Sequence, residues 1–289
     1  MFKNVDLHTH STFSDGSDSP TELVNKAKLI GLSAIALTDH DTVNGLSEFN
    51  AAGKANGIEV IDGIELSTYF DNVSVHIVGL FIDKDSDILN STLENLRKTR
   101  IERNLKIIER FKERDIVIDY DEMLELYPVA VLTRAHFADY LVGKGIAKTR
   151  NEIFERYIGD GKPCYVDREK FSSNDAIELI HKAGGIAVFA HPMLCKVGQE
   201  TLDLMVRSMS EAGLDAIEGL YSTYNTSNEK EVAKLANRYG LLISGGSDYH
   251  GRNKPDIHLG CGRGRLNVPY EIYSKLLEYH TSSRLKGSI

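Results

Sequence analysis

The sequence has only three cysteines in 289 residues, Cys164, Cys195 and Cys261. Their number is odd, they are widely spaced, and no two of them form a Cys-x-x-Cys pair. These features argue against a disulfide framework, which uses an even number of cysteines, and against a structural zinc knuckle, which needs cysteines at short spacings. We expect free thiols. Cys195 follows His191 closely enough to be considered as a metal ligand, although burial is the usual state of a free cysteine.

Long apolar runs are also missing. The segment Met1 to Val5 has no apolar core before a cleavage site, and no later run reaches the roughly 20 residues that span a bilayer. With 42% hydrophobic residues, the chain still has enough apolar side chains for a sizeable core. The sequence therefore predicts a globular, cytoplasmic protein without a membrane partner.

Positive charge is in deficit, since 34 Lys and Arg residues stand against 42 Asp and Glu, a formal net charge of −8. Binding to long nucleic acid or to an anionic membrane relies on summed positive charge, so both are disfavoured. A small anionic substrate stays open, because several divalent cations in one pocket would reverse the local potential.

What the chain has instead is an alternation of apolar runs and amphipathic helical segments. Seven strands are predicted, at 5–7, 32–38, 58–61 with a continuation through Glu65, 73–81, 185–190, 215–220 and 241–244. This alternation is typical of a (β/α) barrel or a doubly wound sheet. We predict an α/β fold, a distorted (β/α)7-type barrel made of residues 1–86 and 166–289.

The alternation stops between 87 and 165. Residues 87–114 are predicted to form one long amphipathic helix, and shorter helices are predicted around 121–126, 133–142 and 151–157. We interpret residues 87–165 as a small helical insertion subdomain over the C-terminal face of the barrel strands.

Histidines are concentrated at the predicted strands. Of ten histidines, six lie in a strand or at its end, whereas His136, His181, His258 and His280 lie on helices or loops and are expected at the surface. His8 and His10 are two residues apart, so a strand points both the same way. The carboxyl ends of the strands carry the chemistry in barrels of this kind.

Together with three acids these six imidazoles form a candidate set of metal ligands. The set is too large for one tetrahedral ion, but it suits two or three ions that each keep an open position. Mixed imidazole and carboxylate ligands favour divalent Mn, Fe or Zn. The nine residues are His8, His10, Asp15, His40, Glu65, His76, His191, Asp248 and His250.

Other polar residues at the strand ends have simpler interpretations. Asp41 could position His40, but is expected to cap the next helix, and Asp39 is expected to serve the structure or to support a metal ligand. Tyr221 and Tyr224 could stack on a base, but are expected to be half-buried packing residues.

The candidate ligands lie in the motifs Asp-Leu-His-Thr-His with Ser-Asp-Gly, Leu-Thr-Asp-His-Asp, Gly-Ile-Glu, Ala-His-Pro and Gly-Ser-Asp-Tyr-His, with His76 in a strand between the third and the fourth. In this order they resemble the motifs of the polymerase and histidinol phosphatase (PHP) superfamily of metal-dependent phosphoesterases. The chain is most similar to the small stand-alone branch that acts on 3′,5′-bisphosphonucleotides or RNA 5′ ends.

The resemblance implies a trinuclear centre. In it, His8, His10, Glu65 and Asp248 would hold the first ion, Glu65, His76 and His191 the second, and Asp15, His40 and His250 the third. We expect hydrolysis of a phosphate monoester by a metal-bridging hydroxide held by Glu65, His191 and Asp248, because bound water loses its proton near neutral pH.

Two cations in the insertion are candidates for binding the substrate phosphate. Arg134 opens a predicted helix, where a cation opposes the macrodipole unless an anion lies nearby. The PHP superfamily has a related motif, and this resemblance supports a phosphate as the anion that Arg134 binds. Lys162, in the turn around Gly161, is the second candidate, and its simpler interpretation is a solvated turn lysine.

The preferred function is conversion of a 3′,5′-bisphosphonucleotide to a nucleoside 5′-phosphate and phosphate. The alternatives are a 5′-3′ exoribonuclease that trims short RNA, a histidinol-phosphate phosphatase, a carbon–nitrogen metallohydrolase and a non-catalytic metal-binding module. Carbon–nitrogen metallohydrolases usually carry a bridging lysine in mid-barrel, and non-catalytic modules typically lose ligands; the chain shows neither feature. The sequence makes no prediction of an oligomeric state.

Overall fold

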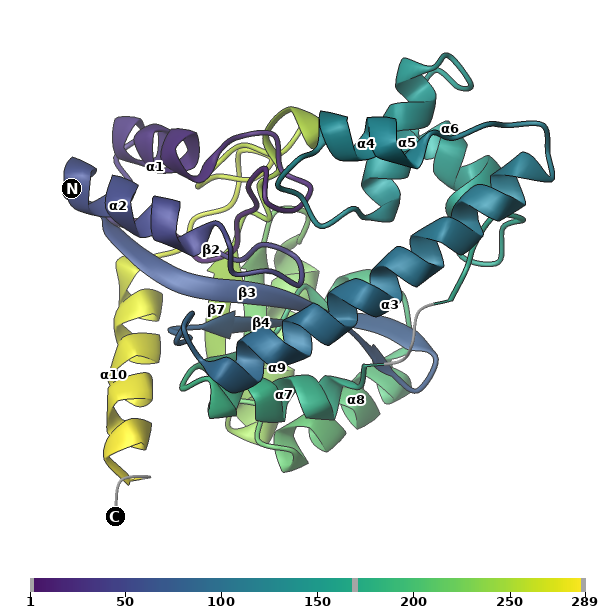
Figure 1. Ribbon diagram of the computed structural model, residues 1–289. Helices are drawn as coiled ribbons and strands as arrows, with labels where there is room; N and C mark the ends of the chain where they lie inside the picture. The colour runs from purple at the N-terminus through teal and green to yellow at the C-terminus, as the bar shows by residue number, and fades with distance from the viewer. Residues whose placement is uncertain (1–2, 168–170, 287–289) are drawn as a thin grey trace. The chain divides into compact units, whose positions relative to one another are not determined.

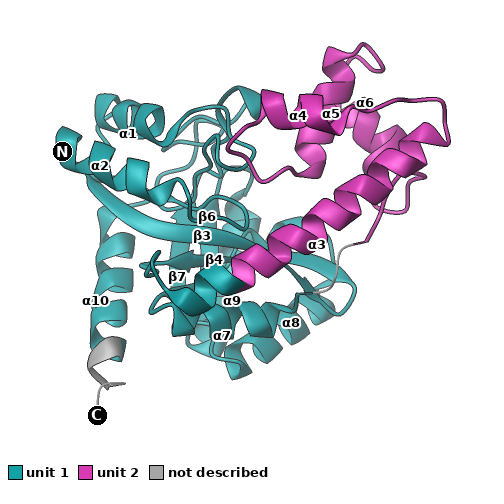
Figure 2. Ribbon diagram, viewed as in Figure 1, with its two compact units in different colours: residues 1–91, 170–289 teal, residues 92–169 magenta. Residues whose placement is uncertain are grey.

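The computed structural model describes residues 3–167 and 171–286 (Figure 1). The chain divides into two compact units (Figure 2). The first unit contains residues 1–91 and 170–289, and the second contains residues 92–169. The boundary at 91 falls within the long helix α3 (Asp87–Lys112).

The first unit is built on one seven-stranded sheet in which the strands pair in chain order. The strands are β1 (Val5–Asp6), β2 (Ala34–Leu37), β3 (Glu59–Phe70), β4 (Val73–Leu80), β5 (Ile186–Phe189), β6 (Ala216–Tyr221) and β7 (Leu242–Gly246). The first and last strands also meet, because the Leu7 N–H donates to the Gly245 carbonyl at 3.2 Å and the Asp248 N–H to the His8 carbonyl at 2.8 Å. The sheet thus nearly closes, and the predicted distorted (β/α)7-type barrel is confirmed.

One part of the sheet departs from the βα pattern. Strand β4 runs antiparallel to both β3 and β5, whereas the other pairs are parallel. Only two residues separate β3 from β4, which is enough for a hairpin, whereas a parallel crossover needs a dozen or more. Glu65 and His76 lie inside the two long strands of this hairpin, as was predicted for His76.

Helices cover the outside of the barrel (Figure 1). Ser19 caps the first helix, α1 (Pro20–Leu29), in a reciprocal capping box with Glu22. Helix α1 packs against α2 (Leu46–Asn56), and α7 (Ser173–Lys182) packs against β4 and β5. The other helices of this unit are α8 (Gln199–Glu211), α9 (Thr226–Tyr239), α10 (Tyr270–Lys286) and the short 3-10 helices η2 (Pro192–Cys195) and η3 (Gly251–Asn253).

The barrel interior is filled by small and branched side chains. Ala34, Ala36, Val78, Leu80 and Val188 belong to one buried cluster, which Leu276 of α10 joins. The apolar layer leaves the polar side chains that follow β1, β2, β5 and β7 at the carboxyl ends of these strands.

The second unit is helical and has a core of its own. After α3 it contains α4 (Tyr120–Leu126), α5 (Arg134–Gly143), α6 (Arg150–Ile153) and a single π-helical turn, η1 (Phe154–Ile158). Its buried cluster includes Phe111, Met123, Phe137 and Leu141. His136 is also buried, with its ring 4.6 Å from that of Tyr127, so the surface position predicted for it is wrong.

None of the helices in residues 3–167 and 171–286 combines the length and the apolar character needed to cross a bilayer.

Candidate metal centre

All nine predicted side chains lie in the first unit and converge on one place. Their donor atoms form four overlapping groups, and within each group the atoms lie no more than 4.8 Å apart. The groups are His10, Asp15, His40 and His250; His8, Glu65 and His191; His8, His10 and Asp248; and His40, Glu65 and His76.

Glu65 lies at the centre of this cluster, with its side chain fully buried in β3. Its Oε1 is 2.8 Å from His76 Nδ1 and 3.0 Å from His191 Nε2. Three imidazole nitrogens approach Oε2, namely His8 Nε2 at 3.3 Å, His10 Nε2 at 3.2 Å and His40 Nδ1 at 3.1 Å. Since each carboxylate oxygen can accept independently, this arrangement lets Glu65 bridge two ions.

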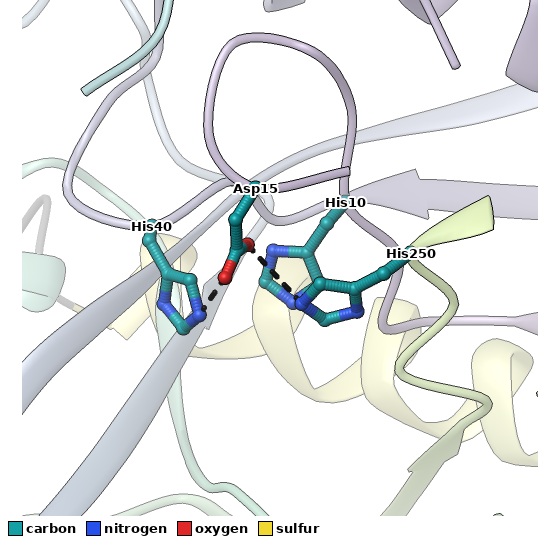
Figure 3. A group of neighbouring side chains, drawn as sticks. All are labelled: His10, Asp15, His40 and His250. Carbon is teal, nitrogen blue, oxygen red and sulfur yellow. Dashed lines mark ion pairs between the residues drawn. The ribbon is translucent and has the colours of Figure 1, made fainter. Parts of the chain in front are cut away.

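The group around Asp15 shares His10 and His40 with the surroundings of Glu65 (Figure 3). Asp15 Oδ1 lies 3.1 Å from His250 Nε2 and 3.9 Å from His40 Nε2. The ring of His10 is centred 4.6 Å from that of His40 and 4.1 Å from that of His250. Three imidazoles this close cannot all be protonated without strong repulsion, so the group favours neutral rings around a shared cation.

A tight loop places Asp15. The Gly16 N–H donates to the Ser11 carbonyl at 2.9 Å, and a Cβ at Gly16 would lie only 2.4 Å from the His10 carbonyl oxygen. Asp39 fixes the same loop, because its carboxylate accepts from the hydroxyls of Ser11 and Ser14, both at 2.5 Å. Close backbone approach therefore explains the glycine, and the structural role expected for Asp39 agrees with these contacts.

Five buried polar atoms of the cluster have no hydrogen-bond partner within the described part of the chain. They are His8 Nε2, His10 Nε2, Asp15 Oδ1, His40 Nδ1 and Glu65 Oε2. A buried polar atom left unsatisfied costs about 1–3 kcal/mol, and native proteins contain few of them. Shared cations would satisfy all five, so the residues fit a group of divalent metal ions.

The charges of the cluster set its pKa values. Burial alone would raise the pKa of Glu65, but the charges of His40 and His8 outweigh it and hold the pKa well below its usual value. Burial alone would lower the pKa of His10, whereas its contacts with Asp248 and Glu65 raise it to about 9. The acids are therefore ionised and ready to bind a cation, which would have to displace the proton of His10.

Glu218, in β6, is a residue of the site that sequence analysis missed. Its buried carboxylate lies 3.1 Å from His8 Nδ1 through Oε1 and accepts the backbone N–H of His191 at 2.7 Å through Oε2. A histidine whose Nδ1–H is held by a carboxylate presents Nε2 to a metal. The available signal was an acid within the apolar strand Ala216 to Tyr221, where an ionised side chain needs a partner.

We expect Glu218→Gln to lower the affinity for divalent metal roughly ten-fold, as is common when a carboxylate behind a metal-binding histidine is lost. The carbonyl oxygen of the glutamine can accept from His8 or from the His191 N–H. Its NH2 group cannot accept from the other one. Competition with a chromogenic chelator measures the change, and Glu211→Gln, on the exposed ion pair with Arg207, is the matched control. An affinity equal to that of the wild type would contradict this role.

Two further donors hold Asp248. The hydroxyl of Tyr221 donates to Oδ2 at 2.6 Å, and the ammonium of Lys254 donates to the same oxygen at 2.7 Å. Oδ1 is left facing the cluster, 3.2 Å from His10 Nε2. Tyr221 is therefore more than the packing residue that was expected, and Tyr224 likewise accepts the Met193 N–H at its hydroxyl, at 3.1 Å.

Two of the candidate ligands, His191 and Asp248, and the neighbour of a third, Asp41, have left-handed backbone. The φ angles are +54° at Asp41, +29° at His191 and +56° at Asp248. Asp41 does not cap α2, whose first turn follows Gly45 without a side-chain cap; its carboxylate accepts the Ser67 N–H at 2.9 Å instead. The capping role predicted for Asp41 is therefore wrong, because the turn directs its side chain toward β3.

Arg134 and Lys162 belong to the second unit. Arg134 is the first residue of α5, where its guanidinium donates to Asp160 Oδ1 at 2.8 Å and its Cζ lies 5.2 Å from the ring centroid of Tyr165. The carboxylate of Asp160 supplies an anion beside the helix N-terminus, so the helix dipole no longer requires a phosphate there. Lys162 is exposed and follows the left-handed Gly161 in a turn.

The barrel and its cluster of imidazoles and carboxylates define the class of metal-dependent barrel enzymes. The chain belongs to the PHP domain family, whose model matches residues 6–239. This match confirms the resemblance read from the motifs, and the enzyme is a hydrolase of phosphoric esters.

Three curated relatives are similar over most of their length. A protein of Haemophilus influenzae named 5′-3′ exoribonuclease is 38% identical over 86% of this chain and 91% of its own. A 3′,5′-nucleoside bisphosphate phosphatase of Chromobacterium violaceum is 35% identical over 86% and 87%. A phosphoribosyl 1,2-cyclic phosphate 1,2-diphosphodiesterase of Eggerthella lenta is 32% identical over 88% and 97%.

Two solved structures are similar as well. A putative metal-dependent phosphoesterase of Bifidobacterium adolescentis has a TM-score of 0.84 at 29% identity and covers 95% of this chain and 96% of its own. A protein of Chromobacterium violaceum described as an amidohydrolase with bound sulfate has a TM-score of 0.83 at 33% identity, covering 94% and 96%.

Proposed function

We propose that the enzyme removes a phosphate group from a small nucleotide, converting a 3′,5′-bisphosphonucleotide to a nucleoside 5′-phosphate and phosphate. The observation that carries the proposal is the convergence of nine candidate ligands, Glu65 among them, on one cluster in which five buried atoms have no partner among the described residues. The bisphosphate phosphatase of Chromobacterium violaceum, at 35% identity, supports this substrate class.

In this proposal His8, His10, Asp15, His40, Glu65, His76, His191, Asp248 and His250 bind two or three divalent ions, with Mn, Fe or Zn suited to the mixed ligands. Such ions, when bound, lower the pKa of water and neutralise the oxygens of a phosphoryl group. The chain itself orients the ligands. Glu65 joins the groups, Glu218 fixes His8, and Glu65, His191 and Asp248 surround the place proposed for the attacking nucleophile.

Arg134 and Lys162 stay proposed as contacts of the substrate phosphate. To bind the phosphate, Arg134 would have to give up its ion pair with Asp160. Asp160 is well exposed, with 74% of its side chain accessible, so this ion pair is a weak competitor.

A second candidate function is 5′-3′ exoribonuclease activity, supported by the 38% identical relative of that name. The formal charge of −8 favours a short RNA end over long RNA, because long RNA binding relies on many cation contacts with phosphates.

Phosphate release across a substrate panel with Mn²⁺ tests the proposal. The panel contains 3′,5′-bisphosphonucleotides, nucleoside monophosphates, histidinol phosphate and a 5′-phosphorylated oligoribonucleotide. We expect the bisphosphonucleotides to have the highest kcat/KM, and chelation of the metal to abolish the activity. Release of nucleotides from the oligoribonucleotide at a higher kcat/KM would favour the second function, and no release from any substrate would refute both.

A further inference from the structure

Lys254 occupies a distinctive position at the metal centre. It directly follows η3, which begins at Gly251, a residue with φ of +62°. This turn brings the side chain of Lys254 back to Asp248, six residues earlier, where Nζ lies 2.7 Å from Oδ2. Lys254 therefore places a positive charge within the same unit as the nine candidate ligands.

Asp248 Oδ2 would have a hydrogen-bond donor even without Lys254. The buried hydroxyl of Tyr221 already donates to that oxygen at 2.6 Å. A half-buried lysine contributes little by an ion pair alone and loses side-chain entropy when it is held in one position. A role toward a further anion would account for a cation at this point.

The ammonium of Lys254 has room for such an anion. Its side chain is 41% exposed, whereas that of Asp248 is 7% exposed, so the lysine reaches from the buried acid toward solvent. An ammonium has three N–H donors, and Asp248 is the hydrogen-bond partner of Nζ in the described part of the chain. The other two donors can reach a ligand, and lysine is a common point-charge partner of phosphate.

We propose that Lys254 binds an oxygen of the substrate phosphate while it holds Asp248. The inference rests on the proposed function and extends it, because both phosphate contacts expected from the sequence lie in the second unit. Lys254 supplies a contact from the unit that also carries the metal ligands. The chemical class of ligand is a phosphate monoester, and inorganic phosphate, the product, shares the same chemistry.

Lys254→Met tests the inference, because methionine keeps most of the aliphatic stem and removes the charge. Each metal-loaded protein is assayed for bound metal by plasma mass spectrometry, for KM and kcat, and for inhibition by inorganic phosphate. We expect unchanged metal content, KM and the phosphate inhibition constant raised about ten-fold, and partial recovery in Lys254→Arg. Lys182→Met, on the exposed pair with Glu178 of α7, is the control and is expected to match the wild type.

Two results would overturn the inference. An unchanged inhibition constant in Lys254→Met would show that the ammonium does not contact phosphate. Loss of bound metal in Lys254→Met would show that Lys254 acts only by holding Asp248. Failure of the proposed function is a separate result, because the wild-type enzyme would then release no phosphate from the panel.

Discussion

Glu65→Gln is expected to lose most of the bound metal and to lower kcat/KM by at least about 10³-fold. Metal ions contribute several kcal/mol to the stabilisation of charge in a phosphoryl-transfer transition state, and each 1.4 kcal/mol corresponds to a factor of ten. Glu65 faces five imidazoles, and the glutamine NH2 group would turn a donor toward some of them. Metal content and phosphate release measured on the same preparation check this result.

The matched control is Asp62→Asn, on the same strand three residues earlier. Asp62 accepts from the amide of Asn50 at 2.8 Å, and the asparagine carbonyl can accept the same bond. We expect metal content and activity close to the wild type in this variant. If Glu65→Gln kept its full metal content, the central bridging position of Glu65 would be refuted.

Metal affinity is expected to rise by at least about 100-fold between pH 6.5 and 8.5, because His10 must lose a proton to bind metal, as must His8, whose pKa Glu65 and Glu218 raise well above its usual value against burial. In the metal-free protein the contacts with Asp248 and Glu65, acting against burial, raise the pKa of His10 to about 9. His40 and His250 lie beside the same ring, and Asp15 and Asp39 are the further nearby acids. A ligand imidazole must be neutral, so each proton displaced gives about a ten-fold change per pH unit below that pKa.

The stability of the metal-free protein should fall as the pH rises. The pKa of His10 is higher in the folded state than its ordinary value, so its contribution to stability is fully present below about pH 6.5 and is lost as the pH rises through 9. Chelator competition from pH 6.5 to 8.5 measures the first trend, and thermal unfolding with and without chelator measures the second. Affinity that does not depend on pH would show that no proton leaves on binding.

Much of the barrel could be predicted from local patterns. The apolar run at 32–38 is a signal within a few residues, and β2 forms inside the predicted range. The antiparallel course of β4 was not predicted, because the third strand was continued only through Glu65 and the two-residue connection after Phe70 was therefore not recognised.

The convergence of the histidines was predictable because parallel strands bring their carboxyl ends to one face. The partners of these histidines were not. Glu218 contacts His8 from 210 residues away, and Asp6 accepts from the Ser247 N–H and hydroxyl across 241 residues. A single sequence contains no signal of such pairing beyond the presence of an acid in an apolar strand. His136 was predicted at the surface, but it is buried in the core of the helical unit, and no local pattern indicated this.

The meeting of β1 with β7 has a consequence for the order of events in biosynthesis. His10 and Asp248 touch only after both strands have left the ribosome, so a growing chain that carries the first histidines has only part of its coordination shell. The complete set of candidate ligands is therefore available only to a chain in which the first and last strands have already met.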